Sequence, residues 1–332
     1  GSEMCIRDRL MPDYKRIELL VKVAKLYYEN DYSQEMIAKK LGLSRPYISK
    51  LLNESKSNGI VKVQVIDPLS IETPLEKNLR EHFGLEKVRI VPMSEGIASL
   101  SRLGLEAARY LDTILQDGDI IGLSWGATVY ECSKALIRRD DLRDIINVQL
   151  CGGVSNLNKN VFATEIAQNF STALGSSSFI LPMPAVLDSR KMRDLLEEDH
   201  NMGKVFQYGR DANIALVTMG SFGPKSALVH TGYISQDKMD ELSARGAVGD
   251  ICTHLIDING NICDQELDQR TAAVPLEDIR NKKYRIGVAQ GLSKVDCILG
   301  ALKGKIVNVL ITNEETAQWV LSKDEQLCAD AV

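Results

Sequence analysis

Three short glycine-containing stretches carry the residue types that hold an anion. They are SWGAT at residues 124–128, CGGVSN at 151–156 and AQGLSK at 289–294. Each follows a strand-like segment and leads into a helical one. Glycine lets backbone N–H groups approach a ligand closely, and the start of a helix favours negative charge. The sequence therefore predicts a site for a small molecule that carries a phosphate.

None of the three stretches matches a standard nucleotide-binding motif. Neither G-x-x-x-x-G-K-[ST] nor G-x-G-x-x-G occurs in the chain, so no nucleotide or other cofactor is predicted. Glycine also serves ordinary turns after strands, which leaves a purely structural role open for any one stretch.

A second set of chemically suited residues lies within QEMIAKKLGLSRPYISKLL, residues 34–52. Its apolar positions, the small Ala38 where two helices would cross and Gly42 at the corner have the spacing of a helix-turn-helix. Ser44 is expected to cap the third helix of the module, which is the recognition helix. Residues near the start of such a recognition helix contact base edges and phosphates in double-stranded DNA. The candidates for these contacts are Ser44, Arg45, Tyr47, Ser49 and Lys50.

The flanking segments complete a predicted winged helix-turn-helix over residues 14–66. Helical spacing of apolar residues predicts a first helix at 14–30, and the alternating IVKVQV at 60–65 predicts a wing strand. Residues 14–64 contain ten Lys and Arg against five Asp and Glu, although the whole chain has a net charge of -5. A basic three-helix bundle that never meets DNA is the structural alternative.

The remaining chain alternates strand-like and helix-like segments. Pro68 and Pro74 interrupt the periodicity, which predicts a linker at 67–75 before an effector-binding and oligomerisation domain at 76–332. Alternation of this kind favours a mostly parallel sheet with helices on both faces, so we expect a Rossmann-like, doubly wound α/β domain. The strand-like segments are VRIVPM, DIIGLS, NVQLCGG, SFILPMP, NIALVTMG, YRIGVAQG and VNVLITN.

Composition favours a cytoplasmic protein. The 332 residues are 44% hydrophobic, and no apolar run approaches the roughly 18 residues of a membrane span. The seven cysteines are scattered without a C-x-x-C pair, which favours reduced thiols over disulfides or a metal site. Residues 1–13 are interpreted as a tag or disordered start and are left out of the fold prediction.

A series of ordered motifs resembles the SorC family of bacterial sugar-binding transcriptional regulators, and within it the branch of deoxyribonucleoside regulators. The motifs are LYYENDYSQEMIAKKLGLSRPYISKLL, DGDIIGLSWGAT, VQLCGG, ANIALVTMG, GYIS, GAVGDIC, IDINGNIC and VAQG…K…GALKGK…NVLITNEETA. The resemblance spans residues 14–321. It implies an operator-binding module joined to a domain similar to phosphosugar isomerases, with a sugar phosphate that releases or reshapes the DNA complex.

The same resemblance implies roles for individual residues. The phosphate loop is Ser124, Gly126, Ala127 and Thr128; the second wall is Cys151, Gly152 and Gly153; the remaining effector contacts are His230, Asp250, Gly291 and Lys294. An anion pairs well with N–H groups, hydroxyls and a lysine, whereas a polyol pairs with a carboxylate. The structural alternatives are a helix cap for Asp250, a solvated surface lysine for Lys294, a structural histidine at 230 and a small buried hydrophobe for Cys151.

The sequence departs from the family pattern in two places. Cys151 stands where several members of the family have a basic residue, so neither a further phosphate contact nor an imine with an open-chain sugar is available there. Gln290 and Leu292 replace small residues beside Lys294. The sequence therefore does not identify the sugar.

Two classes of function fit these residues. The favoured one is a non-enzymatic transcriptional regulator, a repressor that binds operator DNA as a dimer or tetramer and responds to a phosphorylated sugar. The other is a sugar-phosphate isomerase or deaminase with Asp250 or His230 as general base. An isomerase has no use for the N-terminal module, which favours the regulator.

Overall fold

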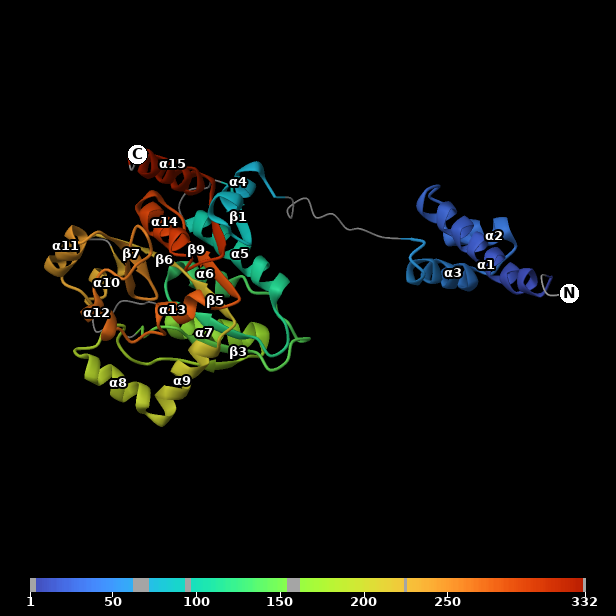
Figure 1. The fold of residues 1–332 in the computed structure, drawn as a ribbon. Helices are drawn as coiled ribbons and strands as arrows, with labels where there is room; N and C mark the ends of the chain where they lie inside the picture. Colours follow the sequence, from blue (N-terminus) through green and yellow to red (C-terminus); the bar gives the residue numbers. More distant parts are fainter. Residues whose placement is uncertain (1–3, 62–71, 93–96, 154–161, 224–225, 331–332) are drawn as a thin grey trace. The chain divides into compact units, whose positions relative to one another are not determined.

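The computed structural model describes residues 4–61, 72–92, 97–153, 162–223 and 226–330. The chain separates into two compact units, residues 1–71 and residues 72–332 (Figure 1). Each unit has its own hydrophobic core and is described by itself.

The N-terminal unit contains three helices, α1 (Met4–Tyr28), α2 (Gln34–Leu41) and α3 (Arg45–Ser57). The Ser33 hydroxyl accepts a hydrogen bond from the backbone N–H of Met36 and caps α2. Gly42 then turns the chain with a φ of 65°, in the left-handed region that favours glycine. The shared core of the three helices is formed by Leu20, Val23, Ile37, Ala38, Ile48, Leu51 and Leu52.

Three details of this unit differ from the prediction or lie beyond it. Helix α1 begins at Met4, ten residues before the predicted start at Tyr14, so most of the stretch interpreted as a tag or disordered start is helical. Ser44 does occupy the N-cap position of α3, but its side chain makes no capping hydrogen bond. Residues 62–65 of the predicted wing strand lie outside the described residues.

The second unit begins within the predicted linker. Thr73 caps α4 (Pro74–Phe83): its hydroxyl accepts from the N–H of Glu76, whose carboxylate accepts from the N–H of Thr73. Residues 72–75 therefore belong to the second unit. Residues 67–71 of the predicted linker lie outside the described residues.

A seven-stranded parallel sheet forms the centre of the second unit, in the order β1-β10-β9-β5-β2-β3-β4. Its strands are β1 (Lys87–Val91), β2 (Ile120–Leu123), β3 (Ile146–Gln149), β4 (Ser177–Phe179), β5 (Ile214–Val217), β9 (Tyr284–Val288) and β10 (Val309–Asn313). Apolar side chains of these strands are buried between the layers. The predicted parallel sheet is confirmed.

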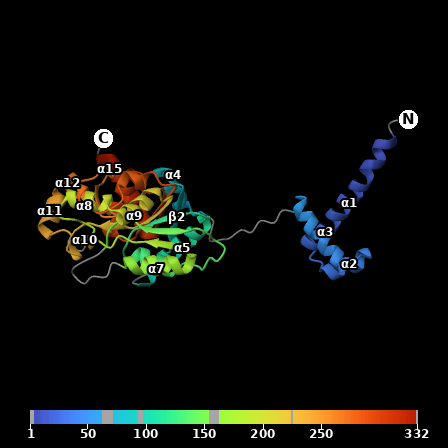
Figure 2. The same ribbon diagram turned by 90° about the horizontal axis from the view of Figure 1, so that it is seen from below.

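Helices cover both faces of the sheet. Helices α5 (Ile97–Ile114) and α7 (Ala163–Leu174) lie on one face and α9 (His200–Asp211) lies on the other (Figure 2). The other helices of the sheet layers are α6 (Ala127–Lys134), α8 (Arg190–Glu198), α13 (Leu276–Arg280), α14 (Val295–Lys303) and α15 (Glu314–Asp330). No helix in the described part of the chain is long and apolar enough to cross a membrane.

A small antiparallel sheet, which the sequence analysis did not predict, is inserted between β5 and β9. It consists of β6 (Met219–Ser221), β7 (Ala247–Ile251) and β8 (His254–Asp257) in that order. The helices around it are α10 (Ala227–His230), α11 (Gln236–Ala244) and α12 (Gln265–Gln269). The predicted strand NIALVTMG is in fact two strands, which enter different sheets on either side of Thr218.

Candidate functional site

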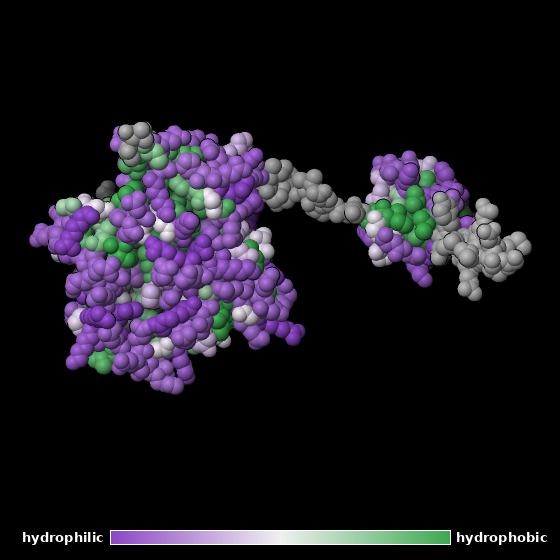
Figure 3. All heavy atoms as spheres, in the orientation of Figure 1, coloured by the Kyte–Doolittle hydropathy of each residue, from purple (hydrophilic) through white to green (hydrophobic). Residues whose placement is uncertain are grey.

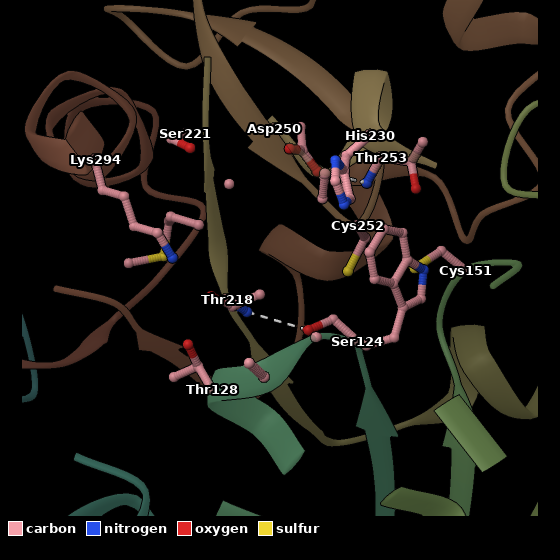
Figure 4. Close-up of a pocket in the computed structure, with 16 residues that line it drawn as sticks. Ser124, Thr128, Cys151, Thr218, Ser221, His230, Asp250, Cys252, Thr253 and Lys294 are labelled. Atoms are coloured by element: carbon pink, nitrogen blue, oxygen red, sulfur yellow. Dashed lines mark hydrogen bonds between the residues drawn. The ribbon is translucent and has the colours of Figure 1, made fainter. Parts of the chain in front are cut away.

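A cavity of about 520 Å³ lies at the carboxyl ends of β2 and β5, beside the small sheet (Figure 4). These neighbouring parallel strands flank the point where the strand order reverses, the usual ligand crevice of an open α/β sheet. The cavity is lined by Ser124, Trp125, Gly126, Ala127, Thr128, Cys151, Thr218, Met219, Gly220, Ser221, Ala227, His230, Asp250, Cys252, Thr253 and Lys294.

Two hydrogen bonds fix the loop between β2 and α6 in the wall of the cavity. The Ser124 hydroxyl accepts from the N–H of Thr218 at 3.1 Å, and the Trp125 indole donates to the carbonyl of Gly152 at 2.8 Å. Gly126 then adopts a φ of 122° and turns the chain into α6. Because the first N–H groups of a helix have no intrahelical acceptor, the start of α6 offers donors and positive potential to an anion.

Lys294 adds a cation to the same side of the cavity. It ends the short 3-10 helix η2 (Leu292–Lys294), and Figure 4 shows its side chain on the side of Thr128. Burial lowers the pKa of its amino group, and the nearby Cys297 and Asp250 oppose that shift. No hydrogen bond or ion pair is found for this amino group among the described residues, which leaves it free to meet an anionic ligand.

Asp250 supplies the carboxylate of the cavity from strand β7. Burial raises the pKa of its carboxyl to about 6, although the N–H of Thr253 donates to it at 3.2 Å and Lys294 also favours the charged form. A carboxylate in such a place accepts hydrogen bonds from ligand hydroxyls. The exposed His230, at the end of α10, lies close to Asp250 in the view of Figure 4.

Two threonine hydroxyls in the cavity wall lack partners. Neither Thr218 Oγ1 nor Thr253 Oγ1 makes a hydrogen bond within the described part of the chain, and both atoms are buried. Cys252 and Thr253 have φ angles of 49° and 74°, which are costly for residues other than glycine. Thr253 thus combines backbone strain with an unpaired hydroxyl, which is typical of a place that a ligand completes.

Thiols form another part of the wall. Cys151 and Cys252 both line the cavity and both are buried. The pKa of the Cys252 thiol is held well above its usual value, first by its hydrogen bond with the Cys151 side chain and second by burial. The Cys252 thiol therefore stays neutral, and the two sulfur atoms give the cavity an apolar, polarisable surface.

Sequence reasoning missed Thr218, Cys252 and Thr253 as wall residues. Cys252 belongs to the motif GAVGDIC, in which the predicted effector contact is Asp250. No local signal distinguishes Thr218 or Thr253, since their place in the cavity depends on how the two sheets meet.

Three predicted effector residues do not line the cavity: Gly152, Gly153 and Gly291. The N–H of Gly152 donates to the carbonyl of Ala272 at 2.8 Å, and a Cβ there would lie 2.6 Å from the Pro184 oxygen. The N–H of Gly291 donates to the Thr316 hydroxyl at 2.8 Å. Gly152 is thus closely packed, and the N–H of Gly291 already has an acceptor. The effector contacts of all three glycines stay predictions. The other predicted effector residues all line the cavity.

The candidate DNA-contacting residues of α3 fall into two groups. Ser44, Arg45 and Lys50 are exposed, and Ser49 is half-buried. Tyr47 is half-buried against the helical core, and its hydroxyl accepts from Arg16. Arg16 also makes two hydrogen bonds to the Glu54 carboxylate, of 3.1 and 2.6 Å. Tyr47 thus ties α3 to α1, while Arg45 and Lys50 are the cations presented to solvent.

Comparison with known proteins agrees with this architecture. Residues 67–322 match the family model described as "Putative sugar-binding domain", and residues 21–58 match a helix-turn-helix model. The chain is 37% identical to the deoxyribonucleoside regulator of Bacillus subtilis (strain 168), over 93% of this chain and 99% of that protein. It is also 34% identical to the sorbitol operon regulator of Klebsiella pneumoniae, over 92% and 98% of the two chains.

This chain belongs to the SorC family of sugar-binding transcriptional regulators. The crystal structure of the full-length sorbitol operon regulator SorC from Klebsiella pneumoniae matches it with a TM-score of 0.71 at 33% identity. That match covers 92% of this chain and 98% of the SorC chain. As in the family, a DNA-binding helix-turn-helix is joined to a sugar-binding α/β domain, and the cavity lies in the second.

Proposed function

We propose that this SorC-family protein is an operator-binding repressor. Its affinity for DNA is changed by a phosphorylated sugar in the cavity at the carboxyl ends of β2 and β5. The observation that carries the proposal is the division of this cavity. Thr128 and Lys294, which suit an anion, lie at one end (Figure 4). Asp250, His230 and Thr253, whose hydroxyl has no partner among the described residues, lie at the other.

The phosphate fits the end formed by α6 and Lys294. Its charge meets the first N–H groups of the helix, the Thr128 hydroxyl and the half-buried ammonium group of Lys294. That group has no hydrogen bond or ion pair among the described residues, although Asp250 lies near it. The sugar hydroxyls then face Asp250, Thr253 and His230, while the carbon skeleton contacts Trp125 and the thiols. Such a ligand would satisfy the polar groups that the protein alone leaves unpaired.

Ligand binding tests this assignment directly. A panel of pentose and hexose phosphates is compared with the same sugars lacking phosphate, by the shift in the temperature of thermal unfolding. At least one phosphorylated sugar should stabilise the protein, and its unphosphorylated counterpart should do so far less. Equal stabilisation by both forms would remove the phosphate from the proposal.

The DNA-binding form is proposed to be a homo-oligomer, either a dimer or a tetramer. A single helix-turn-helix contacts only a half-site, and two of them about one helical turn apart give usable affinity for an operator. Effector binding would then act by favouring one arrangement of the subunits over another, because a ligand with equal affinity for both shifts nothing.

Asp250 also favours a second candidate function, that of a sugar-phosphate isomerase or deaminase. With a pKa of about 6, its carboxyl takes up and releases a proton near neutral pH, as general acid–base chemistry requires. Incubation with pentose and hexose phosphates decides between the two. The regulator proposal predicts unchanged sugar phosphates, and any turnover that is lost in Asp250→Asn would establish the enzyme.

A further inference from the structure

We propose that α8 is a subunit interface, in which the helix pairs antiparallel with α8 of a second copy across a two-fold axis. This inference rests on the proposed function only in that the regulator acts as an oligomer. It adds the surface through which the copies meet.

One face of α8 holds the helix to its own subunit. Arg193 donates to the carbonyl of Ala273 at 3.4 Å, Glu197 pairs with Arg210, and Leu196 packs on the apolar cluster beneath the helix. These contacts fix which side of the helix points outward.

The exposed side of α8 carries two large apolar side chains. No residue of α8 is fully buried, and the side chains of Met192 and Leu195 are 45% and 57% exposed. They are three residues apart and so lie together on the helix surface. Figure 3 shows apolar atoms at the lower left, among hydrophilic neighbours over α8. These two side chains form the apolar part of the proposed contact, which a second copy would remove from water.

The charges beside this apolar pair match the same charges on a second copy when the two helices run antiparallel. Lys191 and Glu198 are both exposed, and they are seven residues, or two helical turns, apart on one edge of the apolar face. In an antiparallel pair, Lys191 of one copy lies opposite Glu198 of the other, twice over. A parallel pair would instead set like charges against each other. The pattern therefore favours a second copy of this chain rather than an unrelated partner.

One two-fold axis satisfies both sets of contacts. The midpoint of Lys191 and Glu198 falls between residues 194 and 195, and the midpoint of Met192 and Leu195 falls between 193 and 194. These points agree to within one residue. The same axis thus brings the apolar side chains together and aligns the opposite charges.

A groove beside α8 supplies further contact area. Two nine-residue helices alone bury less than the roughly 1,200 Å² that a stable interface needs. The adjoining groove has a volume of about 510 Å³, and Met192 and Leu196 form its edge together with Pro182, Leu187 and Tyr233. The interface is therefore expected to extend from α8 across this groove.

Sedimentation of the purified full chain over a range of concentrations tests the apolar contact. Leu195→Asp should raise the dissociation constant of one subunit interface about tenfold or more, because a charge replaces a leucine that the proposed interface buries on both sides of the axis. The matched control is Ile137→Asp, since Ile137 is 61% exposed and lies outside α8. The control should assemble like the unaltered protein.

Charge reversal tests the orientation. Lys191→Glu and Glu198→Lys should each weaken the interface, by about fivefold, since each creates two like-charge pairs. The double variant restores opposite charges and should recover the original dissociation constant. Recovery is a result that simple damage to α8 cannot produce.

Three outcomes would overturn the interface: a chain that is monomeric throughout, assembly that Leu195→Asp leaves unchanged, or a double variant as weak as the single ones. None of them touches the effector proposal, because sugar-phosphate binding is measured separately by thermal shift. Conversely, the protein could pass these tests and yet bind no sugar phosphate. That result would support the α8 interface and contradict the effector proposal.

Discussion

At the scale of single residues, Asp250 makes a prediction about stability. Its carboxyl pKa is raised from 3.8 to about 6, so the folded state binds the proton more tightly than the unfolded state. This contribution to stability is fully present below pH 3.8 and is lost as pH rises through 6. At neutral pH the buried carboxylate therefore destabilises the free protein.

Asp250→Asn should accordingly raise the free energy of unfolding at pH 7, by about 1–3 kcal/mol, and weaken sugar-phosphate binding. The gain should shrink at pH 5, where the original carboxyl is protonated in the folded state. Thermal unfolding at both pH values measures it, with the exposed Glu325→Gln as control. Equal stability of the variant and the original at pH 7 would contradict the buried carboxylate.

Lys294 should separate effector response from DNA binding. Lys294→Ala removes the only lysine among the cavity-lining residues, so the thermal shift caused by a sugar phosphate should largely disappear. Operator affinity without the sugar should be unchanged, because Lys294 lies in the second unit and outside the helix-turn-helix. The matched control is Lys204→Ala, an exposed lysine on α9. A normal response in Lys294→Ala would exclude this lysine from the site.

At the scale of elements, α3 is expected to determine operator sequence. Arg45 is exposed at the first position of α3, and its only ion pair among the described residues is a 3.6 Å contact with the exposed Glu35. Arg45→Ala should weaken operator binding by about 1–3 kcal/mol and relax the preference for one base pair. Lys56→Ala, near the other end of the helix, is the control. Fluorescence anisotropy on operator and on scrambled duplexes measures both effects, and an equal loss on all sequences would assign Arg45 to phosphate contact alone.

The elements also show which parts of the fold can be predicted from the sequence. Periodic apolar residues predicted the helix-turn-helix and the parallel sheet because each element carries its own local signal. The small sheet was missed because β6 follows β5 with only Thr218 between them and no turn residue marks the change of sheet. Nothing local separates one extended segment from two.

The site was predicted in part for a related reason. Residues 124–128 are chemically distinctive, and all of them line the cavity. Gly152 and Gly291 follow strands in the same way. A glycine that packs against Pro184 cannot be distinguished by sequence alone from a glycine that approaches a ligand. Thr253 joins the wall only through the left-handed turn that links β7 to β8. That turn depends on tertiary contacts.

At the scale of the whole molecule, charge is divided unequally between the helix-turn-helix unit and the sugar-binding unit. The basic surplus of residues 14–64 lies in the helix-turn-helix, although the chain as a whole has a net charge of -5. Binding to duplex DNA should therefore weaken steeply as salt increases, in proportion to the number of phosphates neutralised. Titrations from about 50 to 200 mM salt measure this slope. A flat response would argue against DNA as the partner.

The central claim is that occupation of the sugar cavity changes the affinity for the operator. Its most direct measurement is a titration of operator DNA with the unaltered protein, with and without the sugar phosphate that stabilises it most. The account predicts that the sugar phosphate changes operator affinity by about fivefold or more, whereas its unphosphorylated counterpart has little effect. Identical operator affinity with and without a bound sugar phosphate would contradict it.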